Sequence, residues 1–201
     1  MIHMNVYVSQ MCLENGKVPL WMVKGRTVLI QKDLKKGTVA SFYRPIACLP
    51  IMWKLLTGMF SEKIYDHLDE QNLLPDEQKG CRKRSRGTKD QLRIDKAITK
   101  DARKKQRCLN MAWVDCKKTY DIVPHSWILE VINMFGLADN VCTLLSQSMK
   151  HWKTRLTAGD QNLGTVEIKR GIFQGDSLSP LLFVMVMTPI IYDSKGGSER
   201  V

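Results

Sequence analysis

The chain carries the stretch LNMAWVDCKKTYDIVPH at residues 109–125, and our prediction of the fold starts from the first half of this stretch. Apolar residues run from Met111 to Val114 and end in one carboxylate, Asp115. Such a run is typical of a strand that is buried on both faces of a sheet. A carboxylate at the end of a buried strand is costly unless a cation lies beside it. We therefore predict that a metal ion, a Lys or an Arg contacts Asp115.

A second informative stretch, RGIFQGDSLSPLLF, occupies residues 170–183. Gly175 allows another backbone to approach closely, because it has no side chain. Ser179 and Pro180 are typical of the cap and the first residue of a helix. This stretch therefore predicts a tight loop followed by a helix.

The 201 residues include 44% hydrophobic side chains, which is ordinary for a globular protein, and the net charge is +11. The charge is concentrated, because residues 79–107 contain 13 Lys and Arg against 3 Asp, a net +10. Such a block indicates either a surface for a polyanion or a solvated basic helix, and composition alone leaves both interpretations open.

Six cysteines are scattered without a CxxC pair, and the four histidines lie far apart. This pattern indicates reduced thiols without a disulfide partner, and therefore an intracellular protein of the nucleus or cytoplasm. The sequence has no signal peptide and no apolar run of membrane-spanning length, so we expect no membrane partner.

Local patterns predict two hairpins and a series of helices. The first hairpin pairs strands near 27–30 and 42–46, and the second pairs 154–158 with 163–168. Helices are expected to begin at Pro50, Thr88, Ser126, about Asp139 and Pro180. In the helix from Thr88, we expect four residues to face inward: Leu92, Ala97, Ile98 and Ala102. Residues 1–17 are predicted to be weakly ordered, and 193–201 to form a disordered tail.

Together, the two stretches resemble the first and second core motifs of reverse transcriptases, and most closely those of non-LTR (LINE-like) retroelements. The matching residues are Asp115, Lys118, Tyr120, Asp121, Pro124 and His125, and then 170–176 with Ser179 and Pro180. The resemblance covers about residues 18–190. It implies an α+β fold with the fingers and part of the palm of a right-hand polymerase, in which antiparallel palm strands pack on helices. Fingers would span 18–105, and palm 106–192 with a fingers excursion at about 137–168.

The resemblance also implies an RNA-directed DNA polymerase that uses Mg²⁺ or Mn²⁺ in a two-metal mechanism. The partners would be an RNA template, a DNA primer and deoxynucleoside triphosphates. Asp115 would be catalytic and would bind metal together with the backbone of Cys116. The incoming nucleotide would contact Lys32, Arg44, Tyr120, Gln174 and Gly175, although Lys32 also fits an ordinary surface hairpin. The nucleic acid would contact Arg82, Lys83, Arg84, Arg86, Lys89 and Arg93.

The sequence also departs from the family. A third motif, an aromatic–x–Asp–Asp turn between two strands, is not present, and neither is a thumb. Three alternatives therefore stay open: a fragment of a working polymerase domain, a catalytically inactive remnant that binds nucleic acid, and an inert relic. We expect the chain alone to be inactive.

Overall fold

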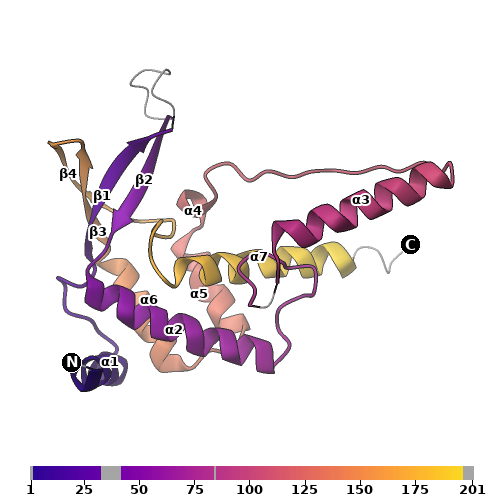
Figure 1. The fold of residues 1–201 in the computed structure, drawn as a ribbon. Helices are drawn as coiled ribbons and strands as arrows, with labels where there is room; N and C mark the ends of the chain where they lie inside the picture. The colour runs from indigo at the N-terminus through magenta and orange to yellow at the C-terminus, as the bar shows by residue number, and fades with distance from the viewer. Residues whose placement is uncertain (1, 33–41, 84, 197–201) are drawn as a thin grey trace.

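A four-stranded sheet forms one end of the molecule in the computed structural model, which describes residues 2–32, 42–83 and 85–196 (Figure 1). The strands are β1 (Lys24–Gln31), β2 (Tyr43–Cys48), β3 (Lys153–Ala158) and β4 (Gln161–Glu167), in the order β2-β1-β3-β4. β1 pairs with β2 and β3 with β4, both antiparallel, so both predicted hairpins are confirmed. β1 and β3 pair in parallel, which joins the hairpins into one mixed sheet.

Helices pack below and beside this sheet (Figure 1). They are α1 (Ile2–Asn15), α2 (Ile51–Glu70), α3 (Thr88–Lys104), α4 (Thr119–Ile122), α5 (His125–Met134), α6 (Asp139–Lys150) and α7 (Ser179–Gly196). α1 lies where we predicted weak order, and α7 continues through Pro189 to a residue within the predicted tail. Among the described residues, no helix combines the length and apolar character needed to cross a membrane.

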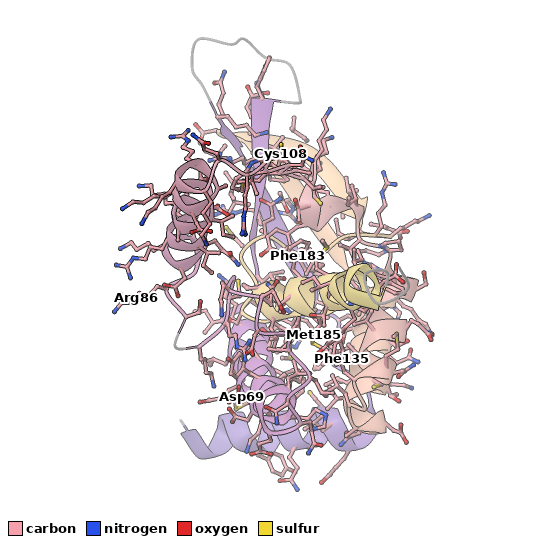
Figure 2. The ribbon with its side chains drawn as sticks, turned by 90° about the vertical axis from the view of Figure 1, so that its right-hand side faces the viewer. Asp69, Arg86, Cys108, Phe135, Phe183 and Met185 are labelled. Carbon is pink, nitrogen blue, oxygen red and sulfur yellow. The ribbon has the colours of Figure 1, made fainter. Side chains whose placement is uncertain are left out.

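The core lies between α2, α5, α6 and α7. Trp53 and Leu68 of α2, Ile128 of α5, Leu144 of α6 and Met185 of α7 are all at most 1% exposed. Met185 belongs to the part of α7 that passes through the middle of the molecule in Figure 2. The core therefore anchors the ends of both sequence motifs, because α5 begins at His125 and α7 begins at Ser179.

The segment 107–116 runs as an extended chain along the outside of the molecule, from the end of α3 to α4 (Figure 1). It pairs with none of the four described strands, and the side chains of Trp113 and Val114 are 74% and 89% exposed. Our prediction of a buried strand from Met111 to Val114 is therefore wrong for this structure. A strand buried on both faces needs hydrogen-bonded neighbours, and the described part of the chain places none beside it.

Helix α3 projects away from the core (Figure 1), and none of its residues is buried. Leu92 and Ile98 are 51% and 44% exposed, and Ala97 is exposed too, so our prediction that they face inward is wrong. Only Ala102, the fourth of these residues, is partly covered. The helical period predicted the helix correctly, but a period does not show whether another element lies against the apolar side.

Candidate active site

The two motifs meet through backbone hydrogen bonds. The Gly171 amide donates to the Val123 carbonyl at 2.7 Å, and the Ile172 amide donates to the Tyr120 carbonyl at 2.8 Å. These bonds join the turn after Asp115 to the start of the second motif. His125 also contacts Gly171, which lies 46 residues further along the chain. The structure therefore brings both motifs into one site.

Two glycines allow this close packing. Gly171 has a φ of +88°, and a Cβ at this position would lie 2.8 Å from the Tyr120 carbonyl oxygen. Gly175 has a φ of +112°, and a Cβ there would lie 2.7 Å from the Ala47 carbonyl oxygen. The loop between them is fixed to β2 by a bond from the Ala47 amide to the Gln174 carbonyl at 2.8 Å. Only glycine fits these positions without strain.

His125 connects the first motif to the second and to Trp152, which lies between α6 and β3. Its Nε2 lies 3.1 Å from the Gly171 carbonyl oxygen, and its ring meets the Trp152 ring edge-on at 5.3 Å. Burial lowers the pKa of His125, and the bond to Gly171 opposes this shift in part. The imidazole is therefore favoured in its neutral form, with the Nε2–H donating to the carbonyl.

Asp176 holds the same loop against α2. Its Oδ1 accepts a hydrogen bond from the Thr57 hydroxyl of α2 at 2.6 Å and another from the Ser177 amide at 2.8 Å. Burial raises the pKa of the carboxyl, while these two hydrogen bonds oppose the rise. The sequence motif contained Asp176, but nothing local indicated its partner 119 residues away.

A pocket of about 420 Å³ opens between the sheet and the joined motifs. Its lining includes Thr27, Ala47, Lys118, Asp121, Arg170 and Gln174. The Gln174 side-chain amide donates to the Asp121 carboxylate at 3.4 Å. Lys118 has a φ of +53°, a conformation that non-glycine residues adopt mainly at turns and functional sites. We did not predict Lys118 as a site residue, although it stood inside the first quoted motif.

The other predicted nucleotide contacts are not part of the lining of this pocket. Tyr120 is half-buried, with its ring edge-on to Phe183 at 5.3 Å. Burial raises the pKa of its hydroxyl, and the nearby Cys81 adds to the rise. Lys32 and the exposed Arg44 lie toward the far end of the β1–β2 hairpin, and neither lines the pocket.

The predicted metal ligands lie on the exposed extended segment. Asp115 and Cys116 are both exposed, and the Cys116 carbonyl accepts a hydrogen bond from the Thr119 hydroxyl at 2.6 Å. Within the described ranges, no three His, Cys, Asp or Glu side chains lie close enough together to hold a metal ion.

Two of the cations that we predicted to bind nucleic acid, Arg82 and Lys83, hold the basic loop (residues 79–83 and 85–87) against the rest of the fold. Arg82 donates to the Pro75 carbonyl at 2.8 Å and pairs with Asp76 at 3.4 Å. Lys83 pairs with Asp66 at 3.2 Å and lies over the Tyr65 ring at 4.6 Å. Arg84 falls outside the described residues. Figure 2 shows Arg86 pointing away from the molecule.

Helix α3 carries a regular stripe of cations. The stripe consists of Lys89, Arg93, Lys96, Lys100 and Arg103. Spacings of four, three, four and three residues place them on one face of the helix, over a length of about 21 Å. All five are exposed, and none forms an ion pair with any other residue that the structure describes. Like charges at such spacings destabilise an isolated helix, so the stripe favours an anionic partner.

Comparison with known proteins identifies the class to which this fold and site belong. The sequence model of the family described as "Reverse transcriptase (RNA-dependent DNA polymerase)" matches residues 33–197. The chain therefore belongs to the reverse transcriptase family.

Curated relatives narrow the class to non-LTR retroelements. The chain is 29% identical over 182 residues to the "Retrovirus-related Pol polyprotein from type-1 retrotransposable element R2" of Nasonia vitripennis. This match covers 90% of the chain and 17% of the relative. It is 26% identical over 183 residues to the protein of that name from Popillia japonica, and this match covers 90% of the chain and 25% of that relative. It is 25% identical over 156 residues to the "Probable RNA-directed DNA polymerase from transposon BS" of Drosophila melanogaster, and this match covers 78% of the chain and 17% of that relative. The chain thus represents a reverse transcriptase domain of the non-LTR type and spans a quarter or less of these relatives.

Proposed function

We propose that this domain holds an RNA template, a DNA primer and a deoxynucleoside triphosphate for RNA-directed DNA synthesis. The observation that carries the proposal is the joining of the two motifs beside a pocket whose lining includes Lys118 and Arg170. Cations in such a pocket suit a triphosphate, and the guanidinium of Arg pairs with two phosphate oxygens at once.

Within this proposal, Gln174 and Gly175 contact the incoming nucleotide, and Tyr120 lies under its sugar. Lys118 and Arg170 join Lys32 and Arg44 as candidate contacts of the triphosphate. The finer division into fingers and palm belongs to the same proposal.

The metal site is not complete in the described residues. Mg²⁺ prefers several hard oxygen ligands, whereas Asp115 supplies one carboxylate and stands apart from any cluster of acidic side chains in the described part. The Cys116 carbonyl already accepts a hydrogen bond from Thr119. These groups do not fit a two-metal centre by themselves, so we assign the metal no step here.

The stripe on α3 is the proposed contact for the template–primer backbone, together with Arg82, Lys83, Arg84 and Arg86. Because Arg82 and Lys83 already have partners within the fold, the exposed stripe is the better place to test binding. The experiment is a titration of a labelled RNA–DNA primer–template at several salt concentrations, followed by fluorescence anisotropy.

Replacing Arg93, Lys96 and Lys100 by Gln is expected to lower the salt slope of log K by about 2 to 3, because each phosphate contact contributes about 0.7–0.9. The matched control replaces Lys17, Lys63 and Lys150, which are exposed elsewhere, and should leave the slope nearly unchanged. An equal loss in both variants would mean that only overall charge matters, and it would contradict the assignment of the stripe.

A further inference from the structure

The outer face of the sheet carries a second group of cations, far in sequence from the basic block. Lys24 lies directly opposite Lys153, and Arg26 directly opposite Arg155, in the parallel register of β1 and β3. Residues two apart on a strand point to the same face, so all four side chains lie together. They line a groove of about 630 Å³, whose lining also includes Cys48 and Thr165.

This arrangement is costly for the sheet in the absence of an anion. Like charges directly opposite each other on neighbouring strands are destabilising. Lys153 is the one member with an ion pair among the described residues, to Glu167 at 2.8 Å. Lys24, Arg26 and Arg155 are exposed, and no described carboxylate pairs with them. The groove therefore keeps an excess of positive charge that faces solvent.

The groove opens on the other side of the sheet from the candidate active site, and Thr154 is the residue that lines both cavities. The pocket between the motifs is lined by Thr27 and Ala47, whereas the groove is lined by Arg26 and Cys48. These residues alternate along β1 and β2, and the register pairs Thr27 with Ala47 and Arg26 with Cys48. The two cavities thus lie on opposite faces of one sheet.

Phosphate suits this groove better than an acidic polypeptide. Two Arg side chains side by side offer paired donors that match phosphate oxygens. A protein partner would normally bury a large apolar anchor at the centre of its interface. The exposed side chains of the lining are instead cationic or small, as in Cys48 and Thr165.

We propose that this groove is a second nucleic-acid contact, which binds the phosphates of a single RNA strand on the face of the sheet away from the active site. The choice of nucleic acid as the occupant rests on the proposed function. The groove itself rests on the register of β1 and β3 and on the charges that this register brings together.

The exposed Cys48 provides a direct probe, and the exposed Cys81 in the basic loop provides a matched one. The purified chain is treated with iodoacetamide with and without a short single-stranded RNA, and alkylation of each cysteine is followed by mass spectrometry. RNA is expected to slow alkylation at both cysteines. Poly-glutamate in the same assay tests for an acidic polypeptide.

The variant with Arg26→Gln and Arg155→Gln is expected to lose protection of Cys48 and to keep protection of Cys81. Its salt slope should fall by about 1.4–1.8, because two phosphate contacts are lost. Lys24→Glu, at the first residue of β1, serves as a second variant with a smaller effect on folding and should weaken protection of Cys48 in the same way. The variant with Arg82→Gln and Lys83→Gln should instead lose protection of Cys81 and keep protection of Cys48.

Three results would overturn the groove assignment. Retained RNA binding without protection of Cys48 would contradict the groove and leave the proposed function intact. Equal protection by poly-glutamate would assign the groove to an acidic protein. Absence of any RNA binding would contradict both the groove and the proposed function.

Discussion

At Gly175, the absence of a side chain lets the loop of the second motif lie against β2. Gly164 in β4 has a similar φ, +106° against +112°, but a Cβ at Gly164 would meet nothing within 4 Å. We therefore expect Gly175→Ala to lower the free energy of unfolding by about 1–3 kcal/mol more than Gly164→Ala, because only the first creates a clash. Urea denaturation of both variants measures the difference, and equal losses would show that the clash is relieved at little cost.

Asp176 provides a pH-dependent test of the same loop. Because burial raises its pKa in the folded state, the folded protein holds the proton more tightly than the unfolded chain. The contribution of Asp176 to the free energy of unfolding is therefore greatest below the pKa of the unfolded chain. It is lost as pH rises from that pKa through the higher pKa of the folded state. Asp176→Asn keeps an oxygen for the Thr57 hydroxyl and removes the titration. The variant should therefore gain stability relative to the parent as pH rises from 4 to 7, measured by denaturation at each pH.

A parent chain whose stability rises relative to Asp176→Asn over that range would contradict this account. It would mean that the hydrogen bonds from Thr57 and Ser177 to the carboxylate outweigh its burial.

At the scale of elements, the sequence predicted the hairpins and helices that interactions between near neighbours in the chain determine. The two hairpins and the helices near Pro50, Thr88 and Asp139 are present because apolar period and turn residues act over a few positions. The helix after Pro124 also forms, although it begins at His125 rather than at the Ser126 that we predicted.

The wrong predictions concern burial, which depends on neighbours. The apolar residues from Met111 to Val114 suit a central strand, and those of α3 suit a packed helix, but neither pattern contains its partner. For the same reason, the sequence did not indicate the bond from Thr57 to Asp176 or the groove. Arg26 and Arg155 meet only because β1 and β3 pair in parallel.

The extended segment 107–116 gives the prediction at this scale. Trp113 is 74% exposed, whereas Trp53 and Trp152 are 1% and 3% exposed. Proteases cut exposed segments that lack hydrogen-bonded structure. We therefore expect limited chymotrypsin digestion to cut after Trp113 well before Trp53 or Trp152, as read by mass spectrometry. Resistance at Trp113 would show that the segment is covered in solution.

At the scale of the whole molecule, the candidate active site has its two motifs in place, but the described residues contain no group of three His, Cys, Asp or Glu side chains that could hold a metal ion. Losing one well-placed charge-stabilising group typically lowers a rate by about 10²–10³. We expect the 201 residues alone to give no detectable primer extension on an RNA template with Mg²⁺ or Mn²⁺. The control is Asp115→Asn. Extension by the parent chain that disappears in this variant would contradict the prediction and would mean that another group completes the metal site.

We propose that a nucleic-acid strand lies along α3 and the basic loop. The most direct measurement is photocrosslinking of the purified chain to an RNA–DNA primer–template with 4-thiouridine in the RNA strand, followed by peptide mapping. We predict crosslinks within 79–104, and also within β1 and β3 if the groove binds RNA. Crosslinks confined to α1, α5 or α6, with none in 79–104, would contradict it.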